Sequence, residues 1–555
     1  MRKHAVSLII ILAFSFVGMK ALFHPDLFTA HDIWHQVARL YHYQSAVFGG
    51  QFPPYWISNL SNGFGYPLFF FSYHLPWLLG LPLLFIGLSI PATIKTLFIL
   101  SYLLSGIFMY SLAFSIFKSR MAGLLAGILY LWAPYRFLTI LVGAAMGTGF
   151  VFVFLPILLW GVYTAISRDK RVLGIILIAI GTSGIILSHL MTVFAIAPIV
   201  LLFLIWTLSQ TKNVKHSLIN IAVGIILGLS ISAFYLFPAV YFSRETQVST
   251  GGFAQNYQHN FVNLNQLIYS KWGYGLFKES AKEGANSYQV GIAQWLSVVS
   301  LSLFLITKNR EMPRPLKSLG ILLLTGFTVS IFAMLDVSRP VWDFVNQFIT
   351  LDYPTMFLLP AVFIGSLLSG LALMVVNKKF RPPLFLVLAF VAFYTNRNHL
   401  RVNMYIDMPV SLVVSSEITT TSFHEYLPKD ADIKFFSEEN ISFVFPKTLS
   451  TSNFYQDANK LSFSVLTPQD MDISIRQFWF PGLALYLDSK KTEFAKDERG
   501  RIKFAIPSGW HNILVTFEGT PIIKIGKLTT LISILVLIVL GRLACIWKTS
   551  YAKKT

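Results

Sequence analysis

The residues of this chain that could do chemistry gather just after its first hydrophobic stretch. The segment TAHDIWHQVARLYHY places Asp32 between His31 and His35 and adds Arg39 further along. An unpaired carboxylate near the hydrocarbon boundary is costly, so an ionisable residue there is a candidate functional group. Asp32 could take a proton from a substrate as a general base. The alternative is that Asp32 only caps a short helix that begins directly after it, because Asp is a favoured N-cap residue.

The same segment has the residue types of a metal site. His35 lies one helical turn beyond His31, and both flank Asp32, so the three side chains could share a divalent metal ion. The alternative is that the histidines are solvated residues of the membrane interface. A divalent metal is the cofactor that this pattern suggests, and the pattern is weak.

Further polar residues lie in apolar surroundings, namely His74 in SYHLP, Arg136 in APYRF and His189 in ILSHLMT. We expect them on the same side of the membrane as Asp32, where they could bind substrate together with Arg39. The alternatives are that the histidines are packing residues and that Arg136 extends its long side chain toward lipid headgroups.

The composition is that of a membrane protein. Of the 555 residues, 55% are hydrophobic and 12% are charged, whereas soluble proteins average about 25% charged residues. Many apolar runs reach the roughly 18–20 residues that a helix needs to cross a bilayer. The net charge of +19 does not indicate nucleic-acid binding, because the basic residues stand in short clusters between apolar runs. The single cysteine, Cys545, excludes an intrachain disulfide.

The basic clusters predict the topology, since Lys and Arg concentrate on the cytoplasmic side. An even number of crossings must then separate each neighbouring pair of clusters. The clusters are Arg2/Lys3, Lys118/Arg120, Arg168/Lys170/Arg171, Lys212/Lys215, Lys308/Arg310/Arg314/Lys317, Lys378/Lys379/Arg381 and Lys548/Lys553/Lys554.

The first interval between clusters holds an odd number of apolar runs, residues 5–23, 68–88 and 96–117. One of them must therefore not cross. Pro76 and Pro82 interrupt the run 68–88, and a proline inside a helix costs about 3 kcal/mol. We predict that this run forms a broken hairpin on the outer side. The alternative is an ordinary crossing, which would put one basic cluster on the wrong side.

The predicted fold is a polytopic α-helical membrane protein with about twelve transmembrane helices, a broken outer hairpin, a first outer loop at 24–67 and cytoplasmic ends. The helices are expected at 5–23, 96–117, 122–140, 148–166, 172–190, 192–209, 216–239, 290–307, 318–335, 353–375, 382–396 and 527–547.

The segment 397–526 differs from the rest of the chain. Apolar and polar residues alternate in it between Gly, Pro, Asp and Asn, which favours an extracytoplasmic β-sandwich-like domain. We therefore predict a transmembrane domain at 1–396, this β-rich domain, and a final helix with a basic cytoplasmic tail at 527–555.

The segment HDIWHQVARLYHYQSAVFGGQFPPYWISNLSNGFGYPLFFFSYHLP resembles the first outer loop of prokaryotic membrane proteins labelled 6-pyruvoyl-tetrahydropterin synthase-related. QFWFPGLALYLDS and GRIKFAIPSGWHNILVTFEGTP are similar to the outer tail of that family. These proteins look like relatives of the GT-C membrane glycosyltransferases and of the YfhO-like sugar transferases. The label of that family is misleading for this chain, because a chain this apolar cannot be a soluble pterin enzyme.

The resemblance implies a GT-C-like fold and an inverting glycosyltransferase at the outer face of the plasma membrane. Its donor would be a polyprenyl-phosphate sugar and its acceptor a surface glycan, lipid or protein. Asp32 would be the catalytic or metal-binding aspartate, and Arg39 or Arg136 would steady the departing phosphate. The alternative is a catalytically silent relative that binds or presents glycan through its β-domain.

The chain departs from the family pattern at three charged positions. Val142 and Gly147 stand where relatives have an arginine and a glutamate, and Met356 stands at another arginine. These losses put donor-phosphate binding in question, and the acidic residues of the outer loop 336–352 are candidates to substitute for them.

Overall fold

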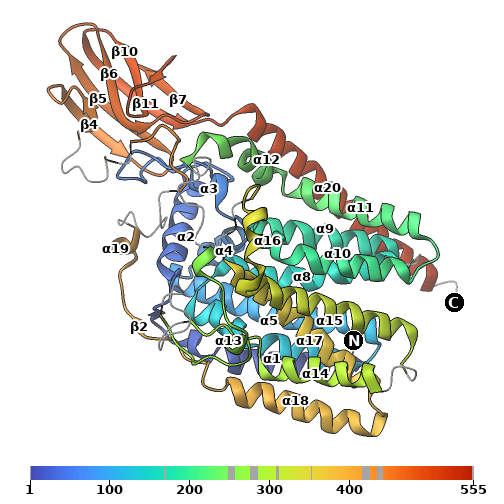
Figure 1. Cartoon of the computed structure of the whole chain (residues 1–555). Coiled ribbons are helices and arrows are strands. Elements are labelled where there is room, and N and C mark those ends of the chain that lie inside the picture. The colour runs from blue at the N-terminus through green and yellow to red at the C-terminus, as the bar shows by residue number, and fades with distance from the viewer. Residues whose placement is uncertain are drawn as a thin grey trace.

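The computed structural model describes residues 2–167, 170–247, 257–275, 286–307, 312–349, 351, 353–414, 425–432, 434 and 442–552. A large helical body is followed in the chain by a β-sheet unit, which stands at one end of the body (Figure 1). Both chain termini lie away from this β-sheet unit (Figure 1).

Eight helices in the described part of the chain are long and apolar enough to cross a membrane, which makes this a multi-pass membrane protein. A ninth span results if the bent pair Arg120–Leu131 and Pro134–Val142 is counted as one. The eight are α5 (Ile90–Phe117), α8 (Met146–Ala165), α9 (Arg171–Ser188), α10 (Thr192–Ser209), α11 (Val214–Ile231), α15 (Arg314–Met334), α17 (Leu358–Val375) and α20 (Pro521–Ala552).

The sequence predicted about twelve spans, and the remaining three form shorter helices. They are α1 (Arg2–Gly18), α14 (Ile292–Thr307) and α18 (Arg381–Asn396), with 17, 16 and 16 residues. At a rise of 1.5 Å per residue, such helices extend about 24–26 Å, less than the roughly 30 Å of a typical hydrocarbon core.

Two of the predicted spans are broken. The run 122–140 divides into α6 (Arg120–Leu131), α7 (Pro134–Phe137) and a wide helical turn at Leu138–Val142, with a bend of 48°. Pro134 explains this break, because a proline disfavours helical geometry at the preceding residue and Ala133 is extended. The run 216–239 likewise divides, at Ser232, into α11 and α12 (Ala233–Phe242).

The predicted break in residues 68–88 is confirmed. This run forms α3 (Leu68–Phe71) and α4 (Leu75–Phe85), which are separated by an irregular step at 72–74. The eleven residues of α4 extend about 16 Å, which is too short to cross a bilayer.

Glycines let α8 and α9 pack closely. A Cβ added to Gly174 or Gly181 of α9 would lie 2.6 Å from main-chain atoms of Ala165 or Leu158 in α8. Small residues are the usual means of close helix packing in membranes, where lipid removes the hydrophobic driving force between helices. This contact joins the two helices whose outer ends approach the first outer loop.

The β-sheet unit is an antiparallel sandwich. One sheet has the strand order β3-β6-β10-β9 and the other β4-β5-β11-β7-β8. Buried side chains such as Phe463, Ile475 and Val515 fill the space between them. The strands are β3 (Val444–Phe445), β4 (Ser450–Gln456), β5 (Lys460–Thr467), β6 (Met471–Phe478), β7 (Leu483–Leu487), β8 (Lys490–Thr492), β9 (Ala495–Lys496), β10 (Arg501–Ile506) and β11 (Gly509–Phe517).

The first part of the predicted β-domain packs elsewhere. The short strand β2 (Tyr405–Ile406) pairs with β1 (Leu27–Phe28), and α19 (Val410–Val414) packs on the helix of the first outer loop. Helix α20 also begins six residues before the predicted 527. The division of the chain at 396 and 526 stays a prediction.

The sandwich binds directly to the first outer loop. Gln477 donates from Nε2 to the carbonyl of Phe64 at 3.0 Å and accepts from the Ser58 hydroxyl at 2.9 Å. Gln456 donates to the carbonyls of Ser58 and Gly63 at 2.7 and 2.8 Å. These buried amide contacts hold the loop against the sandwich and so fix the position of its helix.

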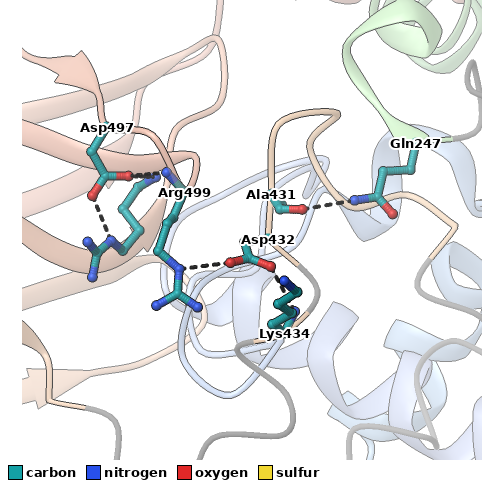
Figure 2. A network of polar contacts seen from close by, with 7 residues as sticks. Gln247, Ala431, Asp432, Lys434, Asp497 and Arg499 are labelled. Carbon is teal, nitrogen blue, oxygen red and sulfur yellow. Dashed lines mark hydrogen bonds and ion pairs between the residues drawn. The ribbon is translucent and has the colours of Figure 1, made fainter.

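A second connection to the sandwich runs through residues 425–432 (Figure 2). Gln247 donates to the carbonyl of Ala431 at 3.1 Å, and Arg499 donates to Asp432 at 2.8 Å. Asp497 accepts from the main-chain N–H of Arg499 and from Arg501, so the turn that carries Arg499 is itself held in place. This segment brings Tyr426 beside the first outer loop.

Candidate functional site

Four polar residues share one face of α2 (Ile33–Phe48), the helix of the first outer loop. Asp32 precedes the helix, and His35, Gln36 and Arg39 follow at spacings of three, four and seven residues. These spacings place side chains on the same side of a helix. Each of the three ionisable side chains in this set keeps part of its surface exposed.

A turn 110 residues further along the chain anchors the start of α2. The carbonyls of Val142 and Gly143 accept from the main-chain N–H groups of His31 and Asp32 at 2.9 and 3.0 Å. The carbonyl of Ala144 accepts from Gln36 Nε2 at 2.8 Å. Ala144 has a φ of +50°, a left-handed conformation that is uncommon for a residue with a side chain and is often found at functional sites.

Asp32 is not a helix cap in the usual sense. Its main-chain carbonyl accepts from Gln36, but its side chain makes no cap hydrogen bond to the described first turn of α2. The carboxylate is therefore left to face the polar cluster. Burial raises the pKa of this carboxyl above its ordinary value of 3.8, against the opposite effects of His35, Arg39 and His31. The side chain is thus desolvated although part of its surface is exposed, and we use the name recess for the polar cluster that Asp32 forms with its neighbours on and opposite α2.

The residues opposite α2 come from the irregular step at 72–74 between α3 and α4 and from the turn between α9 and α10. Tyr73 donates to Gln36 Oε1 at 2.8 Å, and its ring centroid lies 6.0 Å from the Arg39 guanidinium carbon. The ring of His189 lies 6.5 Å from that of Tyr73. Burial and the charge of Arg39 lower the pKa of His189 to about 4, so this imidazole is neutral at pH 7. The Asp32 carboxylate, the Arg39 cation and neutral His189 thus belong to one recess.

Gly147 explains how the chain accommodates the loss of the expected glutamate. A Cβ at this position would lie 2.3 Å from the Ser188 carbonyl oxygen and 3.1 Å from both His189 Cδ2 and Tyr73 Cε1. No larger side chain fits without movement of the main chain. The space that a side chain at position 147 would need is therefore occupied by Ser188, His189 and Tyr73.

His74 does not join the recess. Its Nε2 lies 2.8 Å from the Phe69 carbonyl and its Nδ1 lies 3.1 Å from the Tyr43 hydroxyl. The imidazole is fully buried among aromatic rings. Since a carbonyl can only accept, Nε2 carries the proton and Nδ1 accepts from Tyr43. The contacts are those of a packing residue, the alternative to the substrate-binding role that the sequence suggested.

Arg136 is sequestered inside the helical body. Its guanidinium carbon lies 4.2 Å from the ring centroid of Phe152 and 5.3 Å from that of Tyr102, and its side chain is fully buried. Nη2 reaches the Ser105 hydroxyl at 3.4 Å, whereas Nε and Nη1 have no hydrogen-bond partner among the described residues. The tyrosines that interact with this cation are Tyr130, Tyr102 and Tyr135, and no contact joins it to Asp32 in the described part of the chain.

The predicted metal ligands do not converge. No three His, Cys, Asp or Glu side chains in the described ranges could together hold a metal ion. His31 turns its Nε2 toward the Tyr274 carbonyl at 3.3 Å. The arrangement of His31, Asp32 and His35 therefore does not fit a metal ion.

The acidic residues of the outer loop 336–352 do not reach Asp32 through any contact recorded for the described chain. Asp336 pairs with Arg339, and Asp343 accepts from the Tyr257 hydroxyl at 2.5 Å. Asp352 lies outside the described residues. Met356 packs beside Tyr257 and Trp342 in the same local cluster.

The sequence did not single out Gln36, Tyr73 or Tyr426. Gln36 follows Asp32 by one helical turn, a spacing that could have identified it. Tyr73 directly precedes His74 and could have been considered with it. Tyr426 carried no local signal, because it reaches Arg39 only through the fold.

These elements define a multi-pass helical membrane protein with an outer-loop recess and a β-sandwich that binds that loop. No family model matches the chain, so the resemblance to the 6-pyruvoyl-tetrahydropterin synthase-related family is not confirmed. An uncharacterized protein from Lactococcus lactis subsp. cremoris (strain MG1363) is 25% identical over 273 residues, 48% of this chain and 44% of that protein. The chain therefore covers less than half the length of this relative.

Solved structures of membrane enzymes show a loose likeness. Arabinofuranosyltransferase AftD from Mycobacteria aligns at a TM-score of 0.46 and 13% identity, covering 74% of this chain and 28% of AftD. ArnT from Cupriavidus metallidurans, bound to undecaprenyl phosphate, aligns at 0.42 and 13%, covering 75% and 69%. The oligosaccharyltransferase AglB from Archaeoglobus fulgidus, in complex with an inhibitory peptide and a dolichol-phosphate, aligns at 0.35 and 12%, covering 76% and 55%.

Proposed function

We propose that this chain is a membrane glycosyltransferase that moves a sugar from a polyprenyl-phosphate donor to a surface glycan, lipid or protein at the outer face of the membrane. The observation that carries this proposal is the recess on α2. There the desolvated Asp32 carboxylate, which makes no cap hydrogen bond to the helix, lies with Arg39 and neutral His189. The likenesses to solved structures have TM-scores below 0.5 and add no support at the level of the site.

The chemistry requires a base and a cation. An acceptor hydroxyl attacks the anomeric carbon of the donor sugar, and its proton passes to the Asp32 carboxylate. The bond between that carbon and the phosphate oxygen breaks, and the phosphate leaves with the electron pair as an anion. The Arg39 guanidinium would stabilise this departing charge. A raised carboxyl pKa suits a general base, because it makes the carboxylate a stronger proton acceptor near neutral pH.

A second candidate is the catalytically silent relative that binds or presents glycan. The close packing around Gly147 favours it, because the expected glutamate is absent and cannot be replaced there without movement of the main chain. Val142 contributes only its carbonyl to α2, and no charge.

Transfer of labelled sugar separates the two candidates. Membranes that contain the protein would receive undecaprenyl phosphates carrying radiolabelled glucose, galactose, mannose or arabinose, and incorporation into acceptors of the same membranes would be measured. We expect transfer from at least one donor and a loss of about 10²-fold or more in Asp32→Asn, the effect of removing a positioned base. Asp26→Asn is the matched control, since Asp26 lies in the same loop and pairs with His24.

Each outcome is decisive. Wild-type transfer by a well-folded Asp32→Asn protein would contradict the catalytic role of Asp32. Incorporation from none of the donors, at expression levels that label well with an unrelated transferase, would favour the silent relative.

A further inference from the structure

A pocket of about 580 Å³ lies between α1, α5, α8 and α9. It is far from the recess, because Lys95 near the start of α5 donates to carbonyls of the first outer loop, whereas Lys118 lines the pocket at the other end of the same helix. The 23 residues between these two lysines correspond to about 35 Å of helix. The pocket therefore opens near the opposite side of the membrane, where the basic clusters gather.

The mouth of the pocket is positively charged. Lys118 and Lys170 both line it, and the described lining residues include no Asp or Glu. The Lys118 ammonium lies 5.8 Å from the centroid of the Tyr163 ring. Burial and the like charge of Lys170 lower the pKa of Lys118, so the Lys118 cation is destabilised in this position. A bound anion would relieve that repulsion.

The position of Lys170 at a helix N-terminus makes a second unfavourable contribution to the electrostatic energy at the mouth of the pocket. Lys118 follows the C-terminus of α5, where the helix dipole favours a cation. Lys170 instead precedes the N-terminus of α9, where the dipole favours an anion. An anion between the two lysines would be favoured by both side chains and by the first N–H groups of α9.

The wall of the pocket is mainly apolar and aromatic, with a few hydroxyl groups along it. Phe114, Trp160 and Leu173 line it, and it extends along α5 as far as Ile107. The eleven residues from Ile107 to Lys118 correspond to about 16 Å, close to half of a hydrocarbon core of about 30 Å. The pocket thus has a cationic mouth at the membrane surface and an apolar wall that extends into one leaflet.

We propose that this pocket binds an anionic phospholipid of the leaflet at the basic end of the molecule, the cytoplasmic leaflet by the positive-inside rule. Lys118 and Lys170 bind the phosphate. The part of the acyl chain nearest the headgroup lies along Phe114 and Trp160. This lipid site is independent of the proposed glycosyl transfer. It makes the stability of the helical body depend on lipid charge.

Lipid retention and thermal stability test the site. The purified protein would be placed in phosphatidylcholine nanodiscs that contain increasing amounts of phosphatidylglycerol. Its melting temperature would be measured in each, and the lipid that stays bound would be identified by native mass spectrometry. We expect phosphatidylglycerol to raise the melting temperature and to be retained, and retention to fall at least tenfold in Lys118→Gln/Lys170→Gln. The matched control is Lys378→Gln/Lys379→Gln, which removes two exposed lysines from another basic cluster.

A second variant keeps the charges. Ser111→Trp would fill the apolar depth of the pocket, so it should also abolish retention while both lysines remain. Full retention in either pocket variant would overturn the site. An equal thermal shift with soluble glycerol phosphate would overturn the lipid and assign the pocket to a small phosphate instead.

Discussion

At the scale of residues, the ionised Asp32 carboxylate lowers the stability of the folded protein, because burial removes water from it. Its carboxyl is desolvated, and its pKa in the folded protein is above 3.8. The unfolded chain therefore ionises this group more readily than the folded chain does. At pH values above the raised pKa, this difference lowers the free energy of unfolding, and the loss disappears as pH falls through the raised pKa. A costly charge that the fold retains is typical of a functional group.

Removal of this charge should stabilise the protein. We expect Asp32→Asn to raise the melting temperature in detergent at pH 7 by about 2 °C, on the scale of a small relief of strain in a large chain. The gain should shrink as pH falls through the raised pKa of Asp32, because the wild-type carboxyl then becomes protonated. Asp26→Asn, in the same loop, should show no such gain. A lower melting temperature for Asp32→Asn at pH 7 would contradict the desolvated state of Asp32.

At the scale of elements, the recess depends on how α8 begins. The start of α8 lies directly against the turn that carries His189, and Gly147 is the residue at the contact. The preceding turn supplies the carbonyls that hold α2. A single close approach therefore sets the distance between His189, Tyr73 and the α2 face.

The close contact at Gly147 predicts how a methyl group added there changes the stability of the protein. Gly147→Ala should lower the free energy of unfolding by about 1–3 kcal/mol, the usual cost of overpacking, since its Cβ would meet a main-chain oxygen at 2.3 Å. Gly541→Ala in α20 is the control, because its Cβ would have nothing within 4 Å. Calorimetry or a thermal-shift assay would measure both variants. Equal stability of the two would show that the 188–189 turn moves without cost.

At the scale of the whole molecule, the basic clusters and the sandwich mark opposite ends. Both termini lie away from the β-sheet unit (Figure 1), and Lys118 follows the end of α5 that is opposite to the contact of Lys95 with the first outer loop. By the positive-inside rule we expect the sandwich and the recess to lie outside the cell, and this orientation stays a prediction. The short helices α3 and α4 are consistent with this arrangement, because they remove one crossing from the first interval.

Cysteine labelling tests the orientation. In a Cys545→Ser background, single cysteines at Arg120, Asn213 and Lys379 should resist an impermeant thiol reagent added to intact cells, and should react after permeabilisation. Cysteines at the exposed positions Ser452 and Glu493 of the sandwich should react without it. Reaction at Arg120 from outside would mean that residues 68–88 do not form the outer hairpin.

The sequence alone determined the features that depend on neighbours in the chain. Apolar runs, basic clusters, the prolines of 68–88 and the alternating strands of the C-terminal region are local patterns, and they predicted a multi-pass helical body with a β-sandwich. The same locality identified Asp32 and Arg39 as candidate functional residues of one short segment.

The tertiary structure decided the contacts between distant segments. It brought Tyr73 and His189 to the α2 face, enclosed His74 in hydrogen bonds and sequestered Arg136 among aromatic rings. It also broke the helix at Pro134 and shortened three others. The physical reason is that a side chain's partners across more than a hundred residues follow from how whole helices pack, and hydropathy and spacing along the chain carry no record of that packing.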